Sequence, residues 1–195
     1  MGIPPGMFNR VIQLAEGIGG IVGIRSGTEE PFYLVEGRVG RAEIRRYGPR
    51  IAAQTAVSGA GQDARSTGFR RLAGYIFGGN DRSDKIAMTA PVAQTAAEGG
   101  SMIRFYMPSK WSLETLPEPE DGSVTVVEIP GERYAVLSFT GDRSPAAVAA
   151  RSAELLAELD GSEVSPDGEP IAWFYDPPWT VPFLRRNEVA VRLVA

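Results

Sequence analysis

The stretch AEIRRYGPRIAAQTAVSGAGQDARSTGFRRLAGYIFGGN, residues 42–80, decides the fold. Its first half is extended, because the runs Ala42–Arg45 and Arg50–Val57 flank the turn Arg46-Tyr47-Gly48-Pro49, where glycine and proline favour a change of direction. The small residues Ser58-Gly59-Ala60-Gly61 then interrupt the extended pattern. Two strands joined by a turn are therefore predicted before any helix begins.

The second half of this stretch has helical spacing. From about Gln62 the apolar side chains fall at i, i+3, i+4 and i+7, at Phe69, Leu72, Ala73 and Ile76. The pattern stops at Gly78-Gly79-Asn80, which predicts the end of the helix. Further strands are predicted around this unit, at Phe32–Arg38, Lys85–Val92 and Ser101–Met107.

The same order of elements recurs in the second half of the chain. Val124–Ile129 and Arg133–Thr140 predict two strands around the turn Pro130-Gly131. Ser144-Pro145 predicts a helix start, since serine caps a helix and proline suits its first position. This second helix is expected to end at Gly161, and two strands follow, at Ile171–Tyr175 and Glu188–Val194.

The two halves can be aligned, which predicts the architecture. Glu43-Ile44 matches Glu128-Ile129, Arg50-Ile51-Ala52 matches Arg133-Tyr134-Ala135, and Ile86-Ala87-Met88 matches Ile171-Ala172-Trp173. The chain therefore contains a ββαββ unit twice, over about 32–109 and 123–195. We expect an α+β fold, a distorted β-barrel of two pseudo-symmetric halves, each with one amphipathic helix. A groove between the halves is the natural ligand site.

Composition excludes several classes of site. The 195 residues contain no His and no Cys, so imidazole bases, Ser-His-Asp triads, thiolate nucleophiles and Cys or His metal sites are excluded. No apolar run approaches the roughly 20 residues of a membrane helix, which excludes integral membrane association. We expect a soluble, cytoplasmic protein, and the lack of common catalytic groups favours binding over catalysis.

Charge is distributed unevenly along the chain. The net charge is −4, yet residues 36–71 hold eight arginines against three acids, and residues 114–170 hold thirteen acids against three arginines. The basic segment indicates either a patch for an anionic partner or ordinary solvated faces. Nucleic acid is not expected as the partner, because the chain as a whole is acidic and follows no known nucleic-acid-binding pattern.

Two longer motifs resemble one protein family. The first runs from Gly68 to Asn80 and on to KIAMTAPV at 85–92, and the second is YDPPW at 175–179, followed after seven positions by Asn187-Glu188-Val189. With TEEP at 28–31, EIRRY at 43–47 and FYMP at 105–108, these residues resemble the SOUL haem-binding family over about 28–195. Residues 1–27 are set apart, as an amphipathic or poorly ordered arm.

The resemblance implies binding of haem b or a related tetrapyrrole, without covalent attachment. In the family the ligand lies in a crevice between the first helix and the loop that carries the Tyr-Asp-Pro-Pro signature, with apolar walls and basic residues for the propionates. Carried onto this chain, the helix residues are Arg65, Phe69, Arg70, Leu72 and Ala73. The loop residues are Trp179, Pro182, Phe183 and Arg185. The expected role is non-catalytic haem buffering or transport.

This chain departs from one branch of the family, in which a His is an axial iron ligand. With no His here, any coordination would fall to Tyr, Met or Lys. Two other functions stay open. One is a general small-molecule effector-binding domain, as in bacterial modules that share this architecture. The other is an enzyme that uses Glu43 and Glu128, which the repeat places at equivalent positions.

Overall fold

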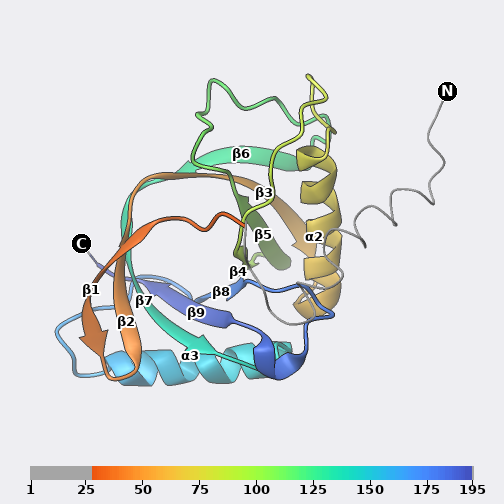
Figure 1. Ribbon diagram of the computed structural model, residues 1–195. Helices are drawn as coiled ribbons and strands as arrows, with labels where there is room; N and C mark the ends of the chain where they lie inside the picture. Colours follow the sequence, from red (N-terminus) through yellow and green to blue (C-terminus); the bar gives the residue numbers. More distant parts are fainter. Residues whose placement is uncertain (1–27, 195) are drawn as a thin grey trace.

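The computed structural model describes residues 28–194, so the expected arm at 1–27 lies outside the described residues. This part of the chain forms nine strands, two long helices and a short 3-10 helix (Figure 1). Their order is β1 (Tyr33–Val39), β2 (Ala42–Tyr47), β3 (Arg50–Ser58), α2 (Gly61–Ile76), β4 (Val92–Ala97), β5 (Gly100–Tyr106), β6 (Val124–Ile129), β7 (Glu132–Phe139), α3 (Pro145–Leu159), β8 (Ile171–Phe174), η1 (Pro182–Leu184) and β9 (Asn187–Arg192).

All nine strands belong to one antiparallel sheet, in the order β1-β2-β7-β9-β8-β4-β5-β3-β6. The predicted α+β class is confirmed. The sheet is strongly curved, as Figure 1 shows, but its outer strands β1 and β6 are not paired with each other, so the ladders of residues 28–194 describe an open sheet. Strands of the two halves meet at β2–β7, at β3–β6 and at β4–β8.

Each helix packs on its own part of the sheet (Figure 1). Helix α2 lies against β3 and β5, where Leu72 and Ile76 are buried in a core cluster with Ile103. Helix α3 lies against β7 and β9, and Leu155 and Leu159 fill a second cluster. The predicted start of α3 is confirmed, because the Ser144 side chain accepts a hydrogen bond from the Ala147 amide and Pro145 opens the helix.

One predicted strand is wrong. Residues 85–91 are not a strand, and the strand that follows α2 is β4, which begins only at Val92. The segment instead returns from the end of α2: the Ile86 amide donates to the Ile76 carbonyl at 2.8 Å, and the Ile86 side chain enters the core. Pro91 has no amide hydrogen, so it cannot donate within a ladder. The alignment of Ile86-Ala87-Met88 with strand β8 therefore fails.

Candidate functional site

The loop between β8 and β9, residues 175–186, passes beside the first turns of α2 (Figure 1). We call it the aromatic loop. Two arginines connect it to the helix. Arg65 of α2 places its guanidinium 3.7 Å from the ring centroid of Phe174, the last residue of β8, and donates to the Arg143 carbonyl at 3.3 Å. Arg143 in turn donates to the Asp176 carbonyl at 2.9 Å.

Beyond Tyr175, which is buried in the core, the aromatic loop is held by hydrogen bonds to its backbone carbonyl groups. Arg185 donates from Nε to the Thr180 carbonyl at 2.7 Å and from Nη2 to the Pro178 carbonyl at 2.8 Å. The Pro182 carbonyl accepts from the Gly141 amide at 2.9 Å. Because these bonds fix the backbone, the loop keeps its shape while its apolar side chains stay in water.

Both the aromatic loop and α2 carry exposed apolar side chains. On the loop, Trp179 is 50% exposed and Phe183 is 73% exposed. On α2, Phe69 is 36% exposed and meets Phe105 edge to face at 5.2 Å. Phe69 and Ala73 follow Arg65 at intervals of four residues, so all three share one side of the helix. We call the exposed side chains of this side and of the loop the helix–loop surface.

The other residues expected from the sequence take different places. Leu72 is fully buried in the core beneath α2, so it supports the helix from behind. Arg65 is buried, and burial together with the nearby charge of Arg143 lowers the pKa of Arg65 to about 10. Arg70 is exposed and lines a groove of about 580 Å³ with Arg71, Glu120 and Asp121. Pro182 is exposed at the start of η1, and Arg185 is tied to the loop backbone.

The structure does not unite the two carboxylates of the enzyme hypothesis. Glu43, in β2, is held by Arg38 at 2.5 Å and by Arg45 at 2.8 Å. Glu128 is exposed on β6, which lies at the other end of the strand order. Across residues 28–194, no group of three or more acidic side chains is placed to hold a metal ion.

A second cluster of functional groups lies inside the sheet, where Glu188 is fully buried. Arg45 donates to both of its carboxylate oxygens, at 2.9 and 3.1 Å, and Tyr175 donates to it at 2.6 Å. Arg186 donates to the same carboxylate at 3.1 Å. Burial opposes the charge, but these bonds hold the pKa of Glu188 below its ordinary value. Arg186 and Glu188 thus belong to one hydrogen-bonded cluster, whereas the side-chain amide of Asn187 between them is buried without a hydrogen bond.

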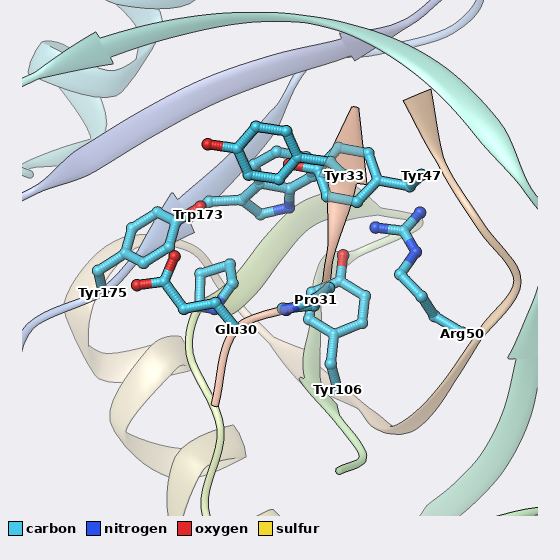
Figure 2. Close-up of a pocket in the computed structure, with 9 residues that line it drawn as sticks. Glu30, Pro31, Tyr33, Tyr47, Arg50, Tyr106, Trp173 and Tyr175 are labelled. Atoms are coloured by element: carbon cyan, nitrogen blue, oxygen red, sulfur yellow. The ribbon is translucent and has the colours of Figure 1, made fainter. Parts of the chain in front are cut away.

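Beside this cluster is a small cavity that the sequence analysis missed, lined by aromatic side chains and by Arg50 (Figure 2). Four of the six tyrosines of the chain line it, at the ends of different strands. The only signal in the sequence was this accumulation of tyrosines near strand ends, which a linear pattern cannot assign to one place.

Comparison with known proteins settles the family. A family model described as SOUL heme-binding protein matches residues 28–192, nearly all of the described chain. The chain belongs to this family. The resemblance inferred from the two long motifs is thereby confirmed. Within residues 28–194 of this SOUL protein, neither α2 nor α3 is long and apolar enough to cross a membrane.

Curated relatives of this SOUL protein include "Heme-binding protein 2" of Mus musculus, 34% identical over 115 residues, which are 55% of this chain and 56% of that protein. The Homo sapiens protein of the same name is 34% identical over 110 residues, 52% of this chain and 53% of that protein. The match thus spans about half the length of the curated relatives.

Several solved structures are similar to this SOUL protein in fold, at low sequence identity. The C-terminal domain of EcmrR has a TM-score of 0.59 at 10% identity, covering 84% of this chain and 98% of that one. A structure titled as a hydrolase from Listeria innocua has a TM-score of 0.57 at 9% identity, covering 79% of this chain and 92% of that one.

Proposed function

We propose that this protein binds haem b or a related tetrapyrrole on the helix–loop surface, without catalysis, for buffering or transport in the cytoplasm. One observation carries the proposal: three aromatic side chains, Phe69, Trp179 and Phe183, stay exposed on two neighbouring elements whose backbones are firmly held. Exposed aromatic side chains grouped in this way are typical of a surface that covers a ligand. Membership of the SOUL heme-binding family supports a flat apolar macrocycle as that ligand.

Apolar contact supplies most of the proposed affinity. Covering about 200 Å² of apolar surface, roughly the area of one aromatic side chain, contributes about 5 kcal/mol. Arg70 and Arg185 are the cations nearest in sequence to the exposed aromatics, and an exposed pair with a propionate adds only about 0.5–1 kcal/mol. The macrocycle therefore matters more to binding than its two carboxylates.

We further propose that the protein supplies no strong axial iron ligand. The chain has no His or Cys, and Tyr175, the tyrosine at the start of the aromatic loop, gives its hydroxyl to Glu188. Burial raises the pKa of Tyr175 well above its ordinary value, which opposes the phenolate form that iron prefers. Binding should then depend little on the metal in the ring.

We expect the single domain, residues 28–195, to bind one ligand and not two, although its two halves resemble each other. Exchanging β2 with β6, β3 with β7, β4 with β8 and β5 with β9 reverses the strand order from β2 to β6, which supports a two-fold relation of halves 32–109 and 123–195. The aromatic loop exists in the second half only, and it lies beside α2. Helix α3 instead carries Glu154 and Glu158, both paired with Arg41.

Titration of the pure protein with haemin tests this function. We expect a shift of the Soret band that saturates near one equivalent, and metal-free protoporphyrin should bind with an affinity within about threefold of haemin. Absence of a Soret shift at micromolar protein would remove the proposed function. If haemin binds strongly and protoporphyrin does not bind, haem binding is supported. The proposal that the protein supplies no strong axial iron ligand is then wrong.

A further inference from the structure

The cavity inside the sheet lies apart from the helix–loop surface. Its walls are the rings of Tyr33, Tyr47, Tyr106, Trp173 and Tyr175, which come from β1, β2, β5 and the end of β8 and face one another in Figure 2. Tyr47 and Trp173 meet edge to face at 5.6 Å, which fixes the two walls relative to each other. The free volume is about 10 Å³, room for one water molecule.

Arg50 is the cation of this cavity, and its donors are unused. The side chain is 8% exposed, and none of its three guanidinium nitrogens makes a hydrogen bond or reaches solvent. The guanidinium lies 4.5 Å from the ring centroid of Tyr47 and 5.1 Å from that of Tyr106. Ring faces stabilise the charge, but they do not replace hydrogen bonds to the in-plane N–H groups. A buried group with this unmet capacity favours an acceptor as its partner.

The acceptors around Arg50 are already engaged. Glu132, whose Oε2 is 3.8 Å from Nη2 of Arg50, accepts from the Tyr134 hydroxyl and from Arg192 at 3.3 Å. Glu30, which lines the cavity, accepts from Nη1 of Arg186 at 2.9 and 3.2 Å. Beside its ion pair with Glu132, Arg50 therefore keeps unused hydrogen-bond donors, which suit a carboxylate rather than a cation.

A short segment of the chain, residues 29–32, forms part of the cavity wall. Glu30 and Pro31 line the cavity, a carboxylate next to an apolar ring among the aromatic walls (Figure 2). The segment is held by polar contacts: the Glu29 carbonyl accepts from the Ala90 amide at 2.9 Å, and Glu30 pairs with Arg186. The next side chain, Phe32, is 80% exposed and does not anchor it. The Ser109 amide also donates to the Glu29 carboxylate, at 2.7 Å. When the strap 29–32 moves aside, water can replace these polar contacts, and the ring of a ligand can replace the apolar contact of Pro31.

We propose that this cavity is the closed form of a second binding site, for a small planar aromatic carboxylate that displaces the strap 29–32. The carboxylate of the ligand takes the in-plane donors of Arg50 in a two-pronged pair, and its ring takes the space of Pro31 between the tyrosines. The ligand thus offers the same chemistry as the strap that it replaces, an acid beside an apolar ring.

Three probes of one shape test the charge requirement on the wild-type chain. Benzoate, benzamide and benzamidinium differ mainly in the group that meets Arg50, and isothermal titration calorimetry compares them, with saturation-transfer NMR for the weak binders. We expect benzoate to bind at least tenfold more tightly than benzamide, and benzamidinium not to bind. Equal affinities for benzoate and benzamide, or a preference for benzamidinium, would overturn the proposal. The proposal would also be overturned if chloride displaced benzoate at a concentration equal to that of benzoate, because the site would then recognise the negative charge and not the ring.

Two substitutions locate the probe. Arg50→Met should lower benzoate affinity at least tenfold, whereas the matched control Arg46→Met, on an exposed arginine of β2, should leave it unchanged. Glu30→Gln should raise the affinity, because it weakens the strap and removes a like charge from the cavity wall. Unchanged benzoate binding in folded Arg50→Met would contradict the assignment. The three-probe comparison needs no variant, so it stands even where Arg50→Met does not fold.

The proposal is independent of the tetrapyrrole site, and one experiment separates them. Haemin titration in saturating benzoate, and on Arg50→Met, should give the wild-type Soret response. Benzoate binding without haemin binding would remove only the proposed function. Haemin binding that benzoate abolishes would place both ligands in one site and overturn the second site.

Discussion

At the scale of single residues, burial decides what a charged group does. Arg70 is exposed, and Arg65, on the same helix, is enclosed by Phe174 and Gln94. Both follow from one basic helical sequence, yet only the exposed one is available to a ligand in water. Glu188 is the extreme case. Its carboxylate is fully buried, and the positive charges that balance it come from its ion pairs with Arg45 and Arg186.

Glu188→Gln should therefore destabilise the protein in a pH-dependent way. Removing one partner of a buried ion pair costs about 3–5 kcal/mol at pH 7. The pKa of Glu188 is lowered in the folded state, so its contribution is present above about pH 4.5 and is lost as the pH falls further. Chemical denaturation between pH 3 and 7 should show a smaller loss of stability on acidification for the variant than for wild type.

The exposed Glu163→Gln serves as the control, with an expected change within about 0.5 kcal/mol at every pH. Identical pH profiles for wild type and Glu188→Gln would refute a charged, ion-paired Glu188.

At the scale of elements, close packing of α2 on β5 depends on a glycine. A Cβ at Gly68 would lie 2.4 Å from Cγ1 of Ile103, well inside a normal contact. Gly74, on the same helix, has nothing within 4 Å of the position that its Cβ would take. The two positions share a helix and a residue type, and they differ in what lies opposite.

Opposite effects of one substitution are therefore predicted. Gly68→Ala should destabilise by about 1–3 kcal/mol, because the added methyl group pushes α2 from the sheet. Gly74→Ala should stabilise by about 0.5–1 kcal/mol, since alanine restricts the unfolded chain and suits a helix. Urea unfolding of both variants provides the comparison, and a stable Gly68→Ala would mean that α2 packs less closely than described.

The helices were predicted well from the sequence, because the pattern that specifies each of them lies within its own segment. The periodicity of residues 62–77 and the Ser-Pro start at 144–145 encode helices within the segment itself. The strand expected at 85–92 failed because its apolar residues serve a return segment that packs behind α2, a tertiary role. The same limit applies to Leu72, since a helical period reveals an apolar side but not whether that side meets the sheet or a ligand. The rings around Arg50 include Tyr106 and Tyr134, which are distant from it in sequence, and no local pattern encodes such contacts.

At the scale of the whole molecule, the acidic net charge and the local arginines act in opposite directions on an anionic ligand. Arg70→Glu reverses one exposed charge on α2, next in sequence to Phe69. We expect haemin affinity to fall about threefold to fivefold at low salt, as a single exposed pair allows. The difference should vanish near 1 M salt, where the Debye length is about 3 Å. A loss that persists in high salt would point to a structural role for Arg70.

If one tetrapyrrole binds between α2 and the aromatic loop, a negative charge on α2 should weaken binding, and the same charge on α3 should not. Phe69 on α2 and Leu156 on α3 are 36% and 39% exposed, so aspartate at either position is tolerated to a similar degree. Soret titration with haemin should show at least a tenfold loss of affinity for Phe69→Asp, because a charge enters an apolar wall, and wild-type binding for Leu156→Asp. Wild-type binding by folded Phe69→Asp, or an equal loss from Leu156→Asp, would contradict the account.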